Sequence, residues 1–284
     1  MQSGRLLTHP ALARRRFLEL AHLPEPALDL TEASLVIALE ENPAIEVERY
    51  LTRVAEWTET VRDRTEGSRD VGRLIEEINR LLFRDEGFHG EEDENYDPRH
   101  ALLNEVLDRH AGVPISLSIL YIEISRRLGI EAAGVGLPGR FLVKLTGPFG
   151  EIVIDPFDHG HVLSTLECQK ILDRMYGGGV KLREHHLRSF SRKKILARLL
   201  SHLKHAYLAR HEIERAAASV DRLLILDEND PWELRDRAAL AMQMHSYREA
   251  IECLERYLTL APHADDGARV RAEIEYLKAW FEQN

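Results

Sequence analysis

Hydrophobic residues in the first third of the chain recur every three or four positions, which is the periodicity of amphipathic helices. The clearest run lies between residues 71 and 82, where the apolar side chains would form one stripe: Val71, Leu74, Ile75, Ile78, Leu81 and Leu82. Residues 11–83 are therefore predicted to be helical. From Asp85 to Asp97 the pattern breaks, because this stretch holds seven acids and no Lys or Arg; it is predicted to be a solvated surface loop.

The middle of the chain changes from helical to strand-like periodicity. Residues 115–128 are apolar on nearly every side, which is typical of a helix buried inside a domain, and Pro114 suits its first turn. Residues 140–145 then alternate as a strand does, and short apolar stretches lie before and after them, at 132–136 and 152–154. The pattern predicts an antiparallel hairpin that packs on a buried helix, which is an α+β arrangement.

The last third of the chain contains an internal repeat. Residues 213–216 read Ile-Glu-Arg-Ala, and residues 247–250 read Tyr-Arg-Glu-Ala at an offset of 34 positions. That period is typical of tetratricopeptide helix pairs. Two repeats and a preceding helix from Ser191 to Ala209 predict about five helices. The predicted fold class is mostly helical α+β: a domain with a small antiparallel sheet, followed by an all-α tetratricopeptide-like domain.

Charge is distributed unevenly over the 284 residues. The net charge is -10, from 38 basic and 48 acidic residues. From Arg188 onward there are 16 of each sign, so the 22 basic and 32 acidic residues before it carry the whole imbalance. Together with the change of periodicity, this predicts a domain boundary near residue 185. The expected domains are residues 1–185, in which a helical N-terminal region covers 1–99 and a core covers 100–185, and residues 186–284.

Composition excludes several classes of protein. No apolar run approaches the ~20 residues that a membrane-spanning helix needs, and the N-terminus lacks the features of a secretory signal. Cys168 and Cys253 form no Cys-x-x-Cys motif, so a disulfide framework or a cysteine-based zinc site is not expected, and a reducing cytoplasm is. An acidic chain without interleaved basic and aromatic residues is not expected to bind nucleic acid. A membrane is not an expected partner either.

Ten short motifs lie in order along nearly the whole chain. They are Leu82-Phe83, Gly87–Gly90, Tyr96–Pro98, Asn104–Leu107, Gly112–Leu117, Gly134–Gly139, Phe141–Val143, Ile154–Phe157, Arg235–Arg237 and Glu255–Leu258. Together they resemble a bacterial family whose members fuse a transglutaminase-like domain, with its papain-type core, to C-terminal tetratricopeptide-like helices. The resemblance implies the same organisation into two domains here.

The resemblance also implies a site built from three positions. In a transglutaminase-like core a Cys opens the buried helix, a His lies on the next strand, and an Asp or Asn ends the strand after it. The helix N-terminus favours the thiolate, the His takes the proton, and the acid orients the His. Here these positions read Pro114, Arg140 and Asp155, so only the acid remains and the site is degenerate. Thiol chemistry is not expected, although a shift of two residues would place Ser116 at the Cys position.

Another nucleophile at the same place is the main enzymatic alternative. Ser116 and Ser118 lie in the first turn of the buried helix, and a serine needs an adjacent base. His110, His159 and His161 are the candidate bases. The simpler interpretation is that the serine packs in the start of the helix and that His159 and His161 are loop residues.

Arg140 and Asp155 have two interpretations. Because they are expected on adjacent strands, the simpler one is a charge pair that holds the hairpin to the helix. The other is that Arg140 lines a remnant cleft near His159 and His161, and binds a small anion such as a carboxylate or phosphate. Asp158 with the two histidines lacks a fourth ligand from elsewhere, so no metal site is predicted.

The sequence therefore favours a non-catalytic scaffold or regulatory protein that binds a protein partner through its tetratricopeptide-like helices. The enzymatic alternative is a serine-dependent hydrolase or acyl transferase. No cofactor is expected. The oligomeric state and the identity of the partner stay open.

Overall fold

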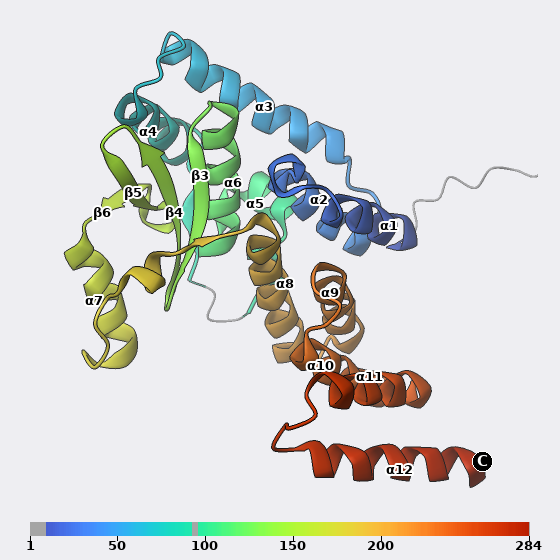
Figure 1. Ribbon diagram of the computed structural model, residues 1–284. Coiled ribbons are helices and arrows are strands. Elements are labelled where there is room, and N and C mark those ends of the chain that lie inside the picture. The colour runs from blue at the N-terminus through green and yellow to red at the C-terminus, as the bar shows by residue number, and fades with distance from the viewer. Residues whose placement is uncertain (1–9, 93–95, 284) are drawn as a thin grey trace, which may run out of the picture. The chain divides into compact units, whose positions relative to one another are not determined.

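The computed structural model describes residues 10–92 and 96–283 (Figure 1). The chain divides into two compact units, residues 1–199 and 200–284. Within the described ranges, no helix combines the length and the apolar composition that crossing a membrane requires.

The division between the units lies inside helix α8 (Arg192–Ala209), whereas the sequence predicts a boundary after residue 185. The difference has a physical reason, because the start of α8 is tied into the first unit. The Arg192 guanidinium donates hydrogen bonds to the carbonyl oxygens of Pro26 and Leu28, at 2.8 and 2.6 Å. One continuous helix thus begins in the first unit and ends in the second.

The first unit begins with the helices that the periodicity predicts. They are α1 (Pro10–Ala21), α2 (Leu30–Glu41), α3 (Val47–Arg64) and α4 (Val71–Asn79), with a 3-10 turn, η1 (Glu25–Ala27), after α1. Where one helix is predicted to continue to residue 82, the chain instead enters a π-helical turn, η2 (Arg80–Asp85). A π turn closes its hydrogen bonds over one more residue than an α turn, which rotates the side chains that follow. Both Leu81 and Leu82 are buried in this arrangement.

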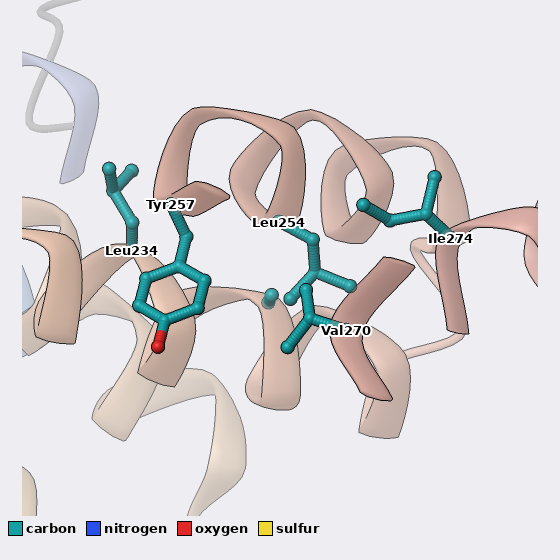
Figure 2. Packing of buried hydrophobic residues seen from close by; sticks show 6 residues of the cluster. Leu234, Leu254, Tyr257, Val270 and Ile274 are labelled. Atoms are coloured by element: carbon teal, nitrogen blue, oxygen red, sulfur yellow. The ribbon is translucent and has the colours of Figure 1, made fainter. Parts of the chain in front are cut away.

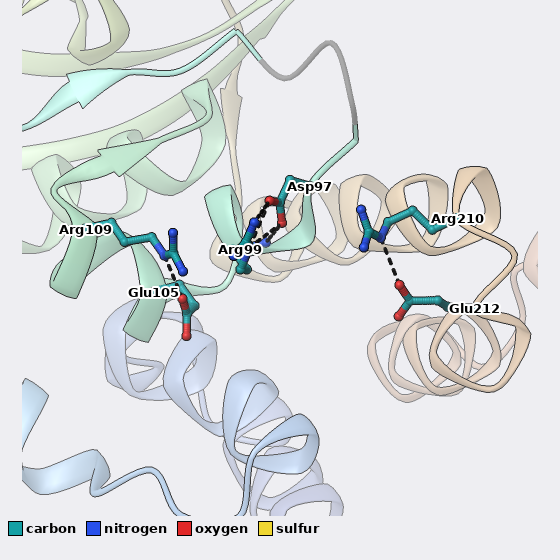
Figure 3. A network of polar contacts seen from close by, with 6 residues as sticks. All are labelled: Asp97, Arg99, Glu105, Arg109, Arg210 and Glu212. Atoms are coloured by element: carbon teal, nitrogen blue, oxygen red, sulfur yellow. Dashed lines mark hydrogen bonds and ion pairs between the residues drawn. The ribbon is translucent and has the colours of Figure 1, made fainter.

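The acidic stretch that is predicted as a solvated loop ends in an ordered cap. Asp97 accepts the backbone N–H of Arg99 at 3.0 Å and pairs with its guanidinium at 2.9 Å, which starts the 3-10 turn η3 (Pro98–His100) (Figure 3). These hydrogen bonds lower the pKa of Asp97 to about 2. Residues 93–95 of the stretch lie outside the described ranges of the chain.

The core of the first unit is α6 (Pro114–Arg127). It follows α5 (Leu103–Arg109), and two short parallel strands, β1 (His89–Gly90) and β2 (Ala111–Gly112), pair beside its start. Every residue from Ile115 to Ser125 is buried. Helices α2, α3 and α5 all contact α6. The prediction of a helix covered on all sides is confirmed.

An antiparallel five-stranded sheet follows α6, in the order β6-β5-β4-β3-β7. Its strands are β3 (Glu131–Leu137), β4 (Arg140–Gly147), β5 (Gly150–Asp155), β6 (His161–Leu163) and β7 (Ser189–Phe190), with 3-10 turns η4 (Pro156–Asp158) and η5 (Glu184–Leu187). The predicted hairpin and the α+β class are confirmed, and the two edge strands are additional. Helix α6 packs against β3 and β4, while α7 (Thr165–Tyr176) packs on the side chains of Val135, Leu137 and Leu142.

The second unit consists of the end of α8 and four further helices. They are α9 (Ile213–Leu226), α10 (Pro231–Gln243), α11 (Tyr247–Leu260) and α12 (Gly267–Gln283). Helices α9 and α11 both begin and end at the predicted repeat offset from each other. The turns before them are equivalent as well, since His211 and His245 both adopt left-handed backbone, with φ of 58° and 59°. The predicted repeat is confirmed in its helices and in its turns.

Apolar and charged contacts both join the helices of the second unit. Six buried residues of α10, α11 and α12 form one cluster: Leu234, Ala238, Leu254, Tyr257, Val270 and Ile274 (Figure 2). Arg237 of α10 is also buried, and it pairs with Asp221 of α9 at 2.6 Å and Glu249 of α11 at 2.5 Å. Arg210 and Glu212 form an ion pair in the turn between α8 and α9, at 2.9 Å (Figure 3).

The carboxyl group of Glu123 is buried in the core of the first unit. Glu123 of α6 accepts the backbone N–H of Leu30 at 3.2 Å and the guanidinium of Arg126 at 3.0 Å. Burial and the nearby charge of Asp29 raise the pKa of Glu123 from 4.5 to about 7. Between these two values the folded state holds a proton that the unfolded state has released. The native state therefore loses stability as the pH rises through this window.

We expect Glu123→Gln to remove this pH dependence, because glutamine keeps an acceptor for Leu30 and carries no charge. The free energy of unfolding of the variant minus that of the wild type should rise by about 3 kcal/mol from about pH 5 to about pH 8. The measurement is urea denaturation followed by Trp57 fluorescence, with Trp232 and Trp280 replaced by Phe so that only the first unit reports. A difference that stays constant over this range would contradict the assignment.

Candidate functional site

Asp155 lies at the end of β5, where the resemblance places the acid of the site. It is buried, and its Oδ1 accepts the backbone N–H of Phe157 at 3.0 Å, which starts η4. The antiparallel register pairs Ile154 of β5 with Val143 of β4, so its continuation sets Asp155 opposite Leu142, and Arg140, two residues before Leu142, points to the same face. The two side chains meet there, with Arg140 Nε 3.4 Å from Asp155 Oδ2. The two residues therefore form an ion pair between β4 and β5, and that this pair holds the hairpin to the helix stays a prediction.

The guanidinium of Arg140 has an aromatic neighbour as well. Its Cζ lies 4.5 Å from the centroid of the Phe157 ring, a cation–π contact. Burial raises the pKa of Asp155, and the charge of Arg140 opposes that rise. The arginine thus supplies the charge that a buried carboxylate needs. Binding of a small anion by Arg140 stays a prediction.

A close approach of backbone to ring shapes one wall of the site. Gly90 of β1 lies so near Phe157 that a Cβ at this position would come within 2.6 Å of the ring. Strand β1 therefore packs against the ring that also contacts Arg140. The sequence motifs include Gly90 but indicate no role for it, because β1 pairs with β2 across the intervening helix α5.

The first turn of α6 presents no free nucleophile. Pro114 is its first residue. Ser116 is buried, and its hydroxyl donates to the carbonyl oxygens of His100 at 2.8 Å and Val113 at 3.0 Å. Ser118 is buried too and donates to the carbonyl oxygen of Phe141 at 3.3 Å. A carbonyl oxygen accepts a hydrogen bond but does not take up the proton, so these contacts hold the serines without activating them.

In the structure His110 is held by hydrogen bonds and by stacking. Its Nε2 lies 2.6 Å from Nη2 of Arg53, and its Nδ1 bonds to the carbonyl oxygen of Glu86. Because a guanidinium only donates, Nε2 must accept, and the proton is assigned to Nδ1 from this network. The ring also stacks on Phe88, with centroids 4.7 Å apart. Both nitrogens of this candidate base are therefore engaged.

The other two candidate bases contact other groups. The ring of His159 lies edge-to-face with Phe83, at 5.8 Å between centroids. His161 Nε2 lies 2.9 Å from Glu167 Oε1, and this hydrogen bond raises the pKa of His161. Nowhere in the described ranges do three or more His, Cys, Asp or Glu side chains gather as a metal site would require, and this includes Asp158 with these two histidines.

Both cysteines lie outside the site. Cys168 of α7 is buried against the sheet, in the cluster that contains Leu137 and Leu142. Cys253 of α11 is half-buried among the helices of the second unit. Burial raises the pKa of both thiols, which is the opposite of what a reactive thiolate needs.

A groove of 810 Å³ lies next to the site and is not predicted by the sequence. Its walls include Arg80 and Phe83 of η2 and the ring of His159. Asn79 ties the walls together, since its Oδ1 accepts the hydroxyl of Tyr121 at 3.0 Å and its Nδ2 donates to the carbonyl of Gly160 at 2.9 Å. The π turn that forms this groove has no residue signature, so periodicity alone could not find it.

A second groove, of 580 Å³, lies in the second unit between α10 and α12. Its lining includes Leu254 and Val270, two members of the apolar cluster drawn in Figure 2. Its sides carry Arg235, Met242 and Tyr276. The sequence predicts a binding surface on these helices, but not which side chains line it.

Family comparisons agree with this organisation into two units. A family model described as Transglutaminase-like superfamily matches residues 48–201, and one described as Tetratricopeptide repeat matches residues 203–275. A UPF0162 protein of Xylella fastidiosa (strain 9a5c) is 36% identical over 90% of this chain and 92% of its own length. The chain belongs to the UPF0162 family. The resemblance seen in the sequence motifs is confirmed.

Other UPF0162 proteins are similar over much of the chain. One from Vibrio cholerae is 28% identical, over 88% of this chain and 93% of its own. UPF0162 protein YchA of Escherichia coli (strain K12) is 26% identical, over 70% of this chain and 74% of its own. Among solved structures, menin aligns over 89% of this chain and 69% of its own at 10% identity and a TM-score of 0.38, too low to carry an argument.

Removing the positive charge from Arg140 should destabilise the first unit. Arg140→Leu leaves Asp155 buried without its ion pair, and we expect a loss of about 2 kcal/mol in the free energy of unfolding near pH 7. The loss should shrink as the pH falls, because the unpaired carboxyl then takes up a proton and no longer carries a buried charge.

Urea denaturation at several pH values, followed through Trp57 fluorescence with Trp232 and Trp280 again replaced by Phe, measures this effect. Arg140→Lys is the matched control, since it keeps a positive charge at the same position. A loss for Arg140→Leu that does not change with pH would show that the ion pair is not its cause.

Proposed function

We propose that this protein is a non-catalytic scaffold or regulatory protein that binds a protein partner through the helices of its second unit. Its transglutaminase-like site is degenerate in this proposal. One observation supports a degenerate site. The resemblance would have Asp155 orient a histidine, but Asp155 pairs with Arg140 instead, with 3.4 Å between Nε and Oδ2. A guanidinium cannot act as a general base near neutral pH.

The environment of the serines also supports a non-catalytic site. A serine hydrolase needs a base within hydrogen-bond reach of its nucleophile. Ser116 and Ser118 donate instead to backbone carbonyls, and His110 has both nitrogens engaged by Arg53 and Glu86. The serine-dependent alternative therefore lacks an observation in its favour.

The groove between α10 and α12 supports the proposal of partner binding. Arrays of tetratricopeptide helices present extended concave surfaces, and this one exposes an aromatic side chain, Tyr276, at 70%. A large apolar side chain that is exposed beside a groove favours a binding surface.

A photo-cross-linking amino acid at position 276 of the full chain tests partner binding. We expect ultraviolet irradiation of a native lysate to join the protein to one discrete partner. The matched control carries the same amino acid in place of Glu275, which is exposed on α12 but does not line the groove. Equal cross-linking from both positions would contradict a groove-based interface.

A serine-reactive fluorophosphonate probe tests the absence of catalysis in the same full chain. We expect no labelling, because both hydroxyls are buried and donate to backbone carbonyl oxygens. If the probe labels the protein and Ser116→Ala or Ser118→Ala abolishes the labelling, the site is catalytic. That result would contradict the non-catalytic assignment but not the proposal of partner binding.

A further inference from the structure

The residues that line the two sides of the groove between α10 and α12 are equivalent positions of the repeat. Arg235, Ala239 and Met242 of α10 line one side, and Arg269, Glu273 and Tyr276 of α12 line the other. Each residue of the first set lies 34 positions before its counterpart in the second. Within each helix the three positions are spaced to share one face.

One end of the groove carries two guanidinium groups, those of Arg235 and Arg269. Asp266, just before α12, lies 2.8 Å from Nη2 of Arg235 and 3.6 Å from Nη2 of Arg269, so both arginines lie at the same end. Asp266 is also held by the hydroxyl of Tyr257, which donates to Oδ1 at 2.6 Å and lowers the pKa of Asp266. Within ion-pair distance the two guanidiniums share this one carboxylate, and Asp265 adds a second negative charge near it. The side chain of Arg269 is 71% exposed and can accept a further acidic partner.

The other end of the groove is apolar. Met242 of α10 and Tyr276 of α12 line it from the two helices. Glu273 lies between the two ends, beside Ala239. A second acid of a ligand at this middle position would meet a like charge, so the groove discriminates against continuous acidic runs.

The length of the groove sets the spacing of its ligand. Arg235 to Met242, and Arg269 to Tyr276, are each seven residues along a helix, which is about 10 Å. An extended peptide covers that distance in about three residues at roughly 3.3 Å each.

We propose that this groove binds an extended linear peptide segment of the partner protein, in which an acidic residue contacts Arg235 and Arg269. An apolar residue about three positions away packs against Met242 and Tyr276. This proposal rests on the proposed function and adds the chemistry of the partner. An acidic residue complements the charge of the arginine end, and an apolar residue complements the far end.

The test is selection of a random linear peptide library displayed on phage against the full-length protein. We expect the selected peptides to share an Asp or Glu about three positions from a Leu, Met or aromatic residue. Fluorescence anisotropy of one selected peptide then measures affinity. Replacing its acid by the amide should weaken binding at least about tenfold, and added salt should weaken it further.

Variants of the protein locate the contacts. Arg269→Gln and Tyr276→Ala, both at exposed side chains, should each weaken the peptide at least about tenfold. Arg271→Gln is the matched control, because Arg271 is exposed on α12 but does not line the groove. Circular dichroism of each variant verifies that the helices are intact.

Several outcomes would overturn the proposal. No selected peptide, a consensus without an acid, or binding that Arg269→Gln leaves unchanged would each show that the ligand is not of this class. Self-association that Tyr276→Ala abolishes would show that a second copy fills the groove. If the cross-link at position 276 succeeds while the acidic consensus fails, only this inference is wrong and the proposed function stands.

Discussion

The first unit is organised by the burial of α6. A helix that is apolar on nearly every side must be covered on every side, so it requires the strands β3 and β4 as well as the helices α2, α3 and α5 around it. The same constraint decides the chemistry of its first turn. Hydroxyls that enter a dry environment need hydrogen-bond partners, and the nearest are backbone carbonyls, which is where Ser116 and Ser118 donate. Burial that stabilises the domain thus also keeps these side chains away from solvent and substrate.

Features that depend on local periodicity were predictable from the sequence. The surroundings of α6, the hairpin of β4 and β5, and the repeat of α9 and α11 all follow from the spacing of apolar residues. Features that depend on contacts between distant segments were not. The π turn η2 reads as ordinary helix because its apolar residues keep helical spacing, and the β1–β2 pair consists of two residues on each strand, too few for any pattern. The division inside α8, rather than near residue 185, could not be read from the sequence, because a hydrogen bond such as that from Arg192 to Leu28 leaves no trace in composition.

The site was partly predictable for the same reason. Arg140 begins one strand and Asp155 ends its antiparallel neighbour, so strand positions alone bring them together. The role of Phe157 beneath the guanidinium, and of Gly90 beneath that ring, requires the three-dimensional arrangement. The roles of the two ring nitrogens of His110 are a further example, since their hydrogen-bond partners, Arg53 and Glu86, are distant from it in the chain. The sequence can identify a histidine as a candidate base, but the hydrogen-bond partners of its ring in the folded structure determine whether a nitrogen lone pair is available.

The equivalence of the turns before α9 and α11 has a consequence for how such an array can change. His211 and His245 take the same left-handed conformation at the same place in the repeat, so the turn that leads into α9 and into α11 is set locally, while the packing between helices is shared with neighbouring repeats. Duplication of one repeat segment would add a pair of helices without altering the backbone geometry of its neighbours. The length of the array is therefore a property that evolution or a designer can adjust independently of the chemistry lining its groove.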